Sequence, residues 1–443
     1  MMHRISQRVR ASVYILLSLV LIASGAGCSR LDASRKTVAL DQIDISKVYA
    51  AAYLVPQRAS ATIPENTYMA FIYADGSYRL VKTKDMEYGK VSWTPKGLFF
   101  ADKDNDYWLA EGQKPKVVPS PKVDTQDTLG VLQDNITHVG VYNGGFTEDG
   151  KGYNEDIVLF DGQKAEKHRF LTDHPVPSIS VCGSSVYAYQ LTDDGVNLSR
   201  ELIRFSSLIV DNHYHPRTIR TRDNILSSDN GIVHNAPCSN DSIVFISGQG
   251  GNSSTIKQKH NDLDYDLRRF LTAEDTEGDN FSYATIEQWD AKTGNRRVLP
   301  LVDEEARPVH FQENQIGYSQ YDSHSLHGDQ FYWWYGDGGL LRTDVNSGKT
   351  VRLNRTHYQK DNWSRSCFWA SFSDKTVDVW YHHINEPNRV TITRQDLDTG
   401  KTINTIEVKG LEKIIHGAGD SNTIDRSFAV NPRAEKLISG QKV

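Results

Sequence analysis

A recurring turn motif constrains the fold of this chain more than any other feature of its sequence. Three segments place Asp-x-x-Thr/Ser-Gly between two apolar runs: IEQWDAKTGNRRVL (286–299), LLRTDVNSGKTVRL (340–353) and ITRQDLDTGKTINTI (392–406). Their aspartates, Asp290, Asp344 and Asp396, are 54 and 52 positions apart. The Asp side chain can accept bonds from backbone N–H groups two or three residues later, and the Gly supplies a positive φ. The motif therefore predicts a hairpin turn that repeats about every fifty residues.

Weaker copies of the same hairpin occur earlier in the chain. YWLAEGQKPKVV (107–118) and IVLFDGQKAEKHRF (157–170) have a shorter turn, and their acids Glu111 and Asp161 are 50 positions apart. Another pair of apolar runs precedes each hairpin, for example at 366–383. Four antiparallel strands in about fifty residues are typical of one blade of a β-propeller.

Counting these units gives the predicted architecture. Six units are complete, at roughly 90–119, 128–171, 177–222, 232–302, 315–354 and 366–409. Residues 67–83 look like the last hairpin of a further unit, and 413–419 with 426–430 look like its first half. Joined, they close the ring with both chain ends and leave no exposed edge. We predict an all-β fold, a single β-propeller over 47–433, with seven four-stranded blades. Six or eight blades are alternatives, because 47–56 could add a strand.

The N-terminus carries an export signal. A basic stretch with three arginines precedes an apolar run from Ala11 to Ala23, and small residues then lead to Cys28. The apolar run is short for a membrane span and typical of a secretory signal peptide, which we place at 1–27. An ordinary signal peptide with a chance cysteine and an uncleaved anchor helix are the alternatives.

Gly25-Ala26-Gly27-Cys28 resembles the lipobox of bacterial lipoproteins. The resemblance implies that Cys28 carries lipid such as palmitate and becomes the first residue of the mature protein. The protein would then be lipid-anchored at the bacterial cell membrane, on its extracytoplasmic side. We interpret the polar residues 28–46 as a tether and 434–443 as a tail.

The net charge limits the classes of binding partner, and the cysteine content limits the possible disulfides. The formal net charge of −6 argues against nucleic acid, which requires a basic surface. Without residues 1–27 the chain has 47 basic and 56 acidic side chains, so attachment to a membrane would depend on the lipid itself. Cys182, Cys238 and Cys367 lie in or beside apolar runs, which favours buried thiols. One disulfide could form in an oxidising compartment, but the sequence does not select the pair.

The Asp-x-x-Thr-Gly-Lys hairpins resemble the repeats of bacterial quinoprotein-like and YVTN-type β-propellers. In quinoprotein alcohol dehydrogenases a docking Trp follows the Gly of the repeat. The matching stretches NRRVLPL, KTVRLNR and KTINTIE contain no Trp, and the chain has no adjacent cysteine pair. We therefore expect no pyrroloquinoline quinone and no other cofactor. A lipidated propeller is also similar in general plan to the outer-membrane assembly lipoproteins.

Several local patterns could indicate chemistry, but each has a plainer interpretation. Two patterns, Asp102-Lys-Asp104-Asn-Asp106 and Asp262-Leu-Asp264-Tyr-Asp266, alternate like calcium loops but lack the later Gly and Glu, so we interpret them as solvated acidic turns. The histidine pairs His213/His215 and His382/His383 lack further ligands at a recognised spacing and are expected on the surface or in loops. The aromatic run Phe331–Tyr335 is expected between blades, the alternative being a sugar-stacking platform. We predict no catalytic, cofactor-binding or metal residue.

Two stretches are longer than blade geometry requires, and long loops on a rigid scaffold often carry function. They are the polar insertion 250–282 and the polar loop 143–156. We predict that they form the contact surface of a non-catalytic binding or scaffold lipoprotein whose ligand is a protein or a glycan. The alternative is a propeller enzyme acting on glycans, a hydrolase or lyase, with carboxylates converging on the axis.

Overall fold

The computed structural model describes most of the propeller and leaves out the predicted signal and lipidation site. It describes residues 36–439 except 57–66, 85, 173–175, 177, 194–197, 205–216, 223–234, 252–280, 308, 310–318, 336–337, 356–365, 384–388 and 416–421. Cys28, the signal 1–27, nearly all of the insertion 250–282, His213, His215 and the Asp262–Asp266 pattern lie outside these residues. No helix in the described part is long and apolar enough to cross a membrane.

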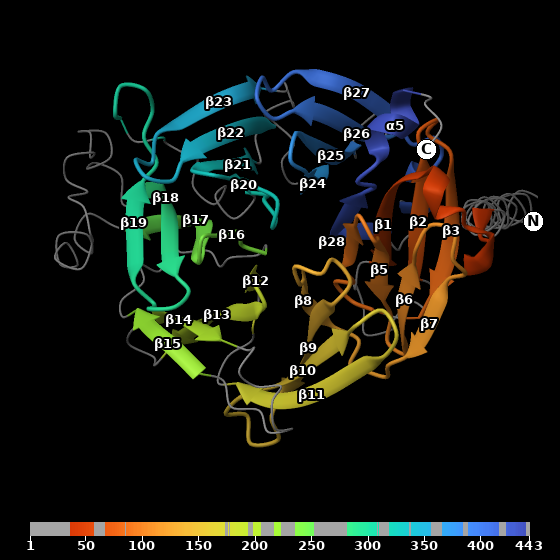
Figure 1. Cartoon of the computed structure of the whole chain (residues 1–443), viewed down its shortest axis with the longest axis horizontal. Coiled ribbons are helices and arrows are strands. Elements are labelled where there is room, and N and C mark those ends of the chain that lie inside the picture. The colour runs from red at the N-terminus through yellow and green to blue at the C-terminus, as the bar shows by residue number, and fades with distance from the viewer. Residues whose placement is uncertain are drawn as a thin grey trace, which may run out of the picture.

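Seven four-stranded antiparallel sheets stand around a common axis (Figure 1). The first of these sheets consists of β4 (Val91–Thr94), β5 (Gly97–Ala101), β6 (Asn105–Leu109) and β7 (Lys116–Pro119). The second consists of β8 (Gln126–Val131), β9 (His138–Phe146), β10 (Tyr153–Phe160) and β11 (Ala165–Thr172). The third consists of β12 (Ser178–Cys182), β13 (Ser185–Asp193), β14 (Leu198–Arg204) and β15 (Arg217–Arg222). In each sheet the first strand is innermost and the fourth is outermost (Figure 1).

Three more sheets follow the same order along the chain. They are β16 (Cys238–Ser239), β17 (Ser242–Gly251), β18 (Phe281–Asp290) and β19 (Arg296–Pro300); β20 (Leu326–His327), β21 (Gln330–Tyr335), β22 (Gly339–Asp344) and β23 (Thr350–Arg355); and β24 (Ser366–Phe372), β25 (Thr376–His383), β26 (Arg389–Asp396) and β27 (Thr402–Glu407). The six sheets coincide with the six complete units predicted from the repeat. The prediction of a single all-β propeller is confirmed.

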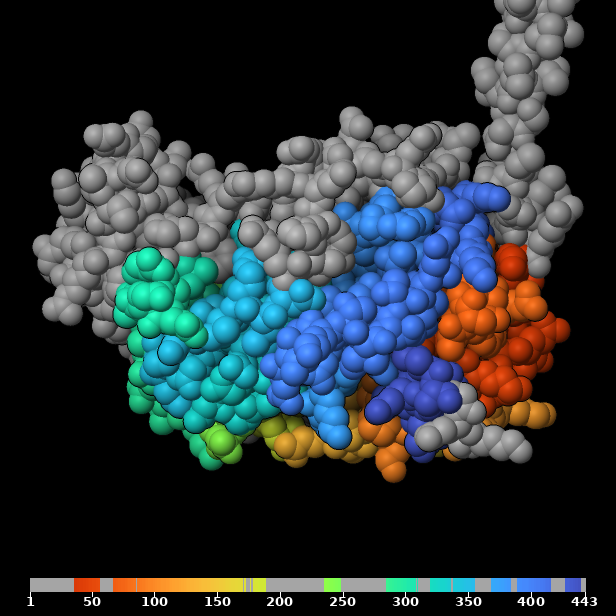
Figure 2. All heavy atoms as spheres, turned by 90° about the horizontal axis from the view of Figure 1, so that it is seen from above, coloured from red at the N-terminus to blue at the C-terminus, as the bar shows by residue number. Residues whose placement is uncertain are grey.

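The last sheet joins the two ends of the chain. The C-terminal strand β28 (Asn422–Val430) is innermost and pairs with β1 (Val48–Pro56), which continues into β2 (Thr67–Tyr73) and β3 (Tyr78–Thr83). Figure 2 shows the red and orange N-terminal residues beside the blue C-terminal ones. Closure by both ends is as predicted, but the division differs. One strand comes from the C-terminus and three from the N-terminus, because residues Glu412–Ile415 form the short helix α4 rather than a strand.

Residues before the predicted boundary at 47 also pack against the propeller. The 3-10 helices η1 (Leu40–Gln42) and η2 (Ile45–Lys47) pack here, and Ile43 and Ile45 are buried. Val38 donates its N–H to the carbonyl of Leu80 on the outer strand β3, at 2.9 Å. At the other end, α5 (Ala434–Ser439) occupies part of the predicted tail, and its Ala434 is fully buried.

The repeated Asp-x-x-Thr/Ser-Gly turns form as predicted. Asp290 Oδ1 accepts the backbone N–H of Thr293 at 2.7 Å and its hydroxyl at 2.8 Å. The turn glycines have positive φ, +73° at Gly348 and +67° at Gly400. A Cβ added to Gly348 would lie 2.1 Å from the carbonyl oxygen of Pro300, on the outer strand of the preceding sheet. The glycine is therefore required both by its own turn and by the neighbouring blade.

Large aromatic side chains fill the spaces between neighbouring sheets. Trp289, Trp333, Trp334 and Trp380 are fully buried. The whole run Phe331–Tyr335 on β21 is at most 5 % exposed, with alternate residues in two different core clusters. Packing between blades, and not a sugar-stacking surface, therefore explains this run.

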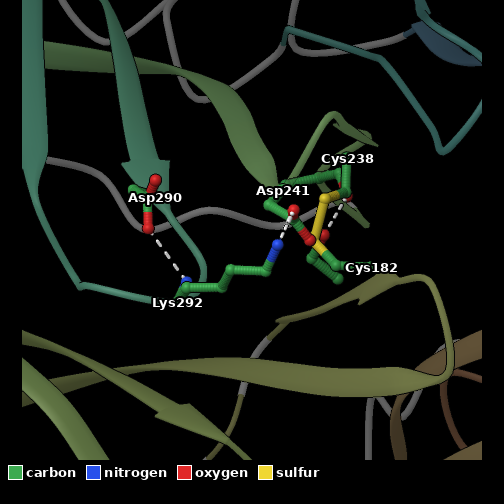
Figure 3. Close-up of a disulfide and its surroundings, with 7 residues drawn as sticks. Cys182, Cys238, Asp241, Asp290 and Lys292 are labelled. Carbon is green, nitrogen blue, oxygen red and sulfur yellow. Dashed lines mark hydrogen bonds and ion pairs between the residues drawn. A yellow bond between two sulfur atoms is a disulfide. The ribbon is translucent and has the colours of Figure 1, made fainter.

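A disulfide joins two neighbouring sheets at their inner strands. Cys182 ends β12 and Cys238 begins β16, with their Cα atoms 5.4 Å apart (Figure 3). Beside it, Lys292 forms an ion pair of 2.5 Å with Asp241, which lies in the turn between β16 and β17. The expectation of buried thiols is wrong for these two cysteines. Their 56-residue separation in sequence gave no indication of the pairing.

We expect the double variant Cys182→Ser, Cys238→Ser to lose about 2–4 kcal/mol of unfolding free energy, because the unfolded chain regains the freedom of a long loop. Denaturant unfolding with and without reductant measures the loss. Reductant should destabilise the natural chain to the same degree and leave the double variant unchanged. An equal effect of reductant on both would contradict the assignment.

Candidate functional site

A cavity lies on the axis of the ring, among the inner strands that the structure describes. Its volume is about 590 Å³. The inner strand of every sheet, or the residues beside it, contributes to its lining. Apolar walls come from Leu129, Ile179 and Phe372, and the half-buried rings of Trp93 and Trp369 also line it. Charged groups enter from several sides, so the cavity combines aromatic surface with ionisable groups.

Asp127 enters the cavity from the first residues of β8. The register of β8 on β9 shifts between Gln126 and Thr128, so Asp127 occupies a β-bulge. Asn143 donates its side-chain amide to Asp127 Oδ2 at 3.3 Å. Burial raises the pKa of Asp127 to about 6, against the opposing influence of Asn143 and Lys90.

Glu155 on β10 lies behind Asp127. It is fully buried, and its Oε1 accepts the backbone N–H of Val176 at 3.2 Å. Among the described residues, its Oε2 has no hydrogen-bond partner. Burial, and secondly the charge of Asp127, raise the pKa of Glu155 to about 9, so its carboxyl group is protonated at neutral pH. The two carboxyl groups thus have well-separated pKa values in one place.

A second group of polar residues lies at the opposite end of the inner strands. Asp322 accepts the backbone N–H groups of Phe372 and His324, each at 2.8 Å. The hydrogen bond and charge of Asp322 raise the pKa of His324, whose side chain is 54 % exposed to the cavity. Asp374, in the turn after β24, adds a smaller contribution of the same sign.

A buried ion pair borders the cavity next to the closing sheet. Arg394 on β26 donates to both oxygens of Asp378 on β25, at 2.9–3.1 Å. The hydroxyl of Tyr49 on β1 donates to the same carboxylate. All three side chains are buried, so these contacts tie the last complete sheet to the sheet that closes the ring.

Those sequence-based metal candidates that lie in the described residues do not form a metal centre. Both oxygens of Asp102 are occupied by backbone N–H groups and by the Tyr107 hydroxyl, and Lys122 pairs with Asp106 at 3.1 Å. Asp102 and Asp106 are fully buried, so the expectation of a solvated turn was wrong. A fixed ammonium group at Asp106 disfavours a calcium ion. In the described part of the chain no three His, Cys, Asp or Glu side chains are placed to hold a metal.

The remaining candidates are placed as follows. His382 and His383 lie at the end of strand β25 and not in a loop, and His382 is 2 % exposed. Most of the polar loop 143–156 is strand, because β9 and β10 extend into it and leave only a short turn. From that stretch, Asn143 and Glu155 reach the Asp127 cluster. Sequence reasoning did not single out Asp127, since a bulge leaves no periodic signal.

The ring of sheets around a cavity defines a β-propeller. The chain belongs to the family of the YycP beta-propeller domain, whose model matches residues 46–214 and 267–430. No curated protein matches the chain.

Solved structures show only distant likeness. A Synechocystis ACO mutant has a TM-score of 0.45 and 8 % identity, over 87 % of this chain and 93 % of that one. Apo AztD from Citrobacter koseri has a TM-score of 0.36 and 12 % identity, over 86 % and 98 %. BamB from Moraxella catarrhalis has a TM-score of 0.35 and 10 % identity, over 78 % and 98 %. Likeness at this level carries no argument about function.

Proposed function

We propose that this protein is an exported lipoprotein, anchored by lipid at Cys28 on the extracytoplasmic side of the membrane. Its propeller acts as a binding or scaffold domain for a protein or glycan ligand and does not catalyse a reaction. We count each of the seven sheets as one blade. The disulfide between Cys182 and Cys238 supports export, because disulfides persist in oxidising compartments.

The axial cavity carries this proposal. At about 590 Å³ it has the size of small-molecule and oligosaccharide sites, and it offers both aromatic rings and ionisable groups. The walls come from the inner strand of each sheet or from the residues beside it, so the site is preformed by the scaffold. A rigid concave site that combines aromatic rings with charged groups suits recognition.

The anchor is tested by Cys28→Ser. We expect the natural chain to incorporate labelled fatty acid and to sediment with membranes, and the variant to incorporate none and to become soluble after export. The variant of another cysteine, Cys367→Ser, is the control and should behave as the natural chain does. A Cys28→Ser protein that remains in the membrane fraction, with no label in either form, would contradict the anchor.

The binding function is tested by capture from the native cell envelope. The full chain should retain a protein or glycan that Trp93→Ala, which removes one aromatic wall of the cavity, retains poorly. A parallel capture with 250–282 deleted asks whether the insertion contributes. Thermal melting verifies that each variant is folded. Equal capture by the natural chain and by Trp93→Ala would argue against the cavity as the binding site.

One observation favours a second candidate, an enzyme acting on glycans. Asp127 and Glu155 lie together with pKa values of about 6 and about 9, and a carboxylate beside a protonated carboxyl is the pattern of general base and acid. A turnover screen over glycans separates the two candidates. Hydrolysis or elimination that is lost in Asp127→Asn would establish the enzyme.

A further inference from the structure

Two β-bulges converge on one corner of the cavity. The first, on β8, directs Asp127 toward the axis. The second lies on β9, where the register shifts between the pairs Tyr153–Phe146 and Glu155–Asn143. Bulges re-aim side chains and are common beside functional sites. A single bulge could be incidental, but here two neighbouring strands place an acid and an amide against each other.

The second bulge fixes the orientation of Asn143. Gly145, with φ +81°, donates its N–H to Asn143 Oδ1 at 2.8 Å. The amide nitrogen of Asn143 is therefore the end that faces Asp127, and it satisfies Oδ2 alone. Asp127 thus presents its remaining carboxylate oxygen to the cavity that it lines.

A second carboxyl group, that of Glu155, lies behind Asp127. Its side chain is fully buried, and its Oε2 has no hydrogen-bond partner in the part of the chain that the structure describes. A buried polar atom without a partner costs free energy, and a folded protein retains one chiefly where function requires it. Glu155 is neutral at pH 7, so the negative charge at this place in the cavity is that of Asp127, which favours a cationic hydrogen-bond donor over an anionic group.

The nature of the cation follows from its surroundings. The described residues offer no third acidic or histidine ligand here, so a metal ion would be poorly held. The half-buried rings of Trp93 and Trp369 line the same cavity. Aromatic faces pack against the apolar faces of sugar rings and attract ammonium groups. A sugar that carries an ammonium group could bind both features, with its ring against the tryptophans and its ammonium group at Asp127.

We propose that the cavity binds a glycan that carries free amino groups, with one ammonium group held by Asp127. Glu155 acts as a positioning residue behind Asp127, because it is too buried to touch the ligand. This inference rests on the proposed binding function and specifies its ligand class. An ammonium group beside Asp127 favours the ionised form of both acids, so binding and proton release are linked.

The charged groups around Asp127 set the pH dependence. Lys90, which precedes β4, favours its ionised form, and Glu155 is neutral at pH 7. Asp156, next to Glu155 on β10, is already paired with Arg169 at 2.8 Å. With a pKa of about 6, ionised Asp127 increases roughly eightfold between pH 5 and pH 6.5. Affinity should rise by that factor and fall again when the ligand amine loses its proton.

The test is calorimetric titration of the full chain in detergent with two probes, a glucosamine hexamer and an N-acetylglucosamine hexamer. At pH 6.5 we expect the glucosamine hexamer to bind at least about tenfold more tightly, as a charge-assisted hydrogen bond implies. Its affinity should follow the bell-shaped pH profile above, whereas the acetylated hexamer should show no rise between pH 5 and pH 6.5. This comparison needs no variant.

Two variants test whether the preference for the glucosamine hexamer depends on Asp127. Asp127→Asn should remove the tenfold preference and the acidic limb of the profile. Asp149→Asn is the matched control, because Asp149 is an exposed acid in the turn of the same β9–β10 hairpin. Equal binding of both hexamers, binding of neither, or an amine preference that survives Asp127→Asn would each overturn the inference. Equal binding would still leave glycan binding in place, and capture from the envelope tests that function separately.

Discussion

Truncation of the chain after Gly410 will abolish cooperative folding of the whole propeller, and not only of its last sheet. The truncation removes β28, which pairs with β1 along six residue pairs from Ala50–Val430 to Pro56–Asn422. It also removes the Ser427 hydroxyl that accepts the N–H of Val91 on the next sheet. Strand β1 would then expose an unpaired edge. Because the stability of a domain is only about 5–15 kcal/mol, we expect the loss of closure to unfold the whole ring.

Circular dichroism and calorimetric melting measure this effect. We expect the truncated chain to show no cooperative transition and to aggregate through its open edges. A chain ending at Ser439 retains β28 and α5 and is the control that should melt as the full chain does. A truncated protein that melts cooperatively near the natural temperature would show that the ring does not depend on closure.

Arg394→Ala will destabilise the folded state by about 3–5 kcal/mol, because it leaves the carboxylate of Asp378 buried without its cation. Asp378 is 1 % exposed and accepts three bonds from Arg394. The Tyr49 hydroxyl would remain as its partner but carries no charge. Denaturant unfolding monitored by tryptophan fluorescence measures the loss.

Two further variants make this prediction specific. Arg307→Ala removes a 69 % exposed arginine that pairs with Asp303 and Glu305, and it should change stability little. The double variant Asp378→Leu, Arg394→Met replaces the ion pair by apolar groups of similar size and should recover at least half of the loss. Arg394→Ala with natural stability would contradict the structural role of the pair.

The propeller architecture was predictable from the sequence because its repeated turns are formed by residues that are adjacent in the chain. The Asp-x-x-Thr/Ser-Gly turn needs only a few adjacent residues, so its three copies revealed both the hairpins and their period. The closing sheet was found for the same reason, since 67–83 contains a recognisable hairpin. Its division into one and three strands was missed, because the apolar pair Ile414–Ile415 suggested a strand where the structure has the helix α4.

The candidate site could not be predicted from the sequence, for a different reason. Asp127 and Glu155 come together through two register shifts, and periodic patterns contain no information about a one-residue bulge. The disulfide joins inner strands of two sheets that become neighbours only when the ring forms. The polar stretch 143–156 did draw attention to Asn143 and Glu155, but as part of a loop. Their relation to Asp127 required the fold.

The packing of residues 36–47 against the propeller limits how far the propeller can lie from the membrane. With Val38 bound to Leu80 on β3, Cys28 and Lys36 are eight residue steps apart, and a chain of that length reaches at most about 29 Å when fully extended. Under the proposed lipid anchor at Cys28, the propeller would stay within a few nanometres of the bilayer surface. Its effective concentration toward ligands at the bilayer surface is correspondingly high, and ligands farther out must diffuse to it.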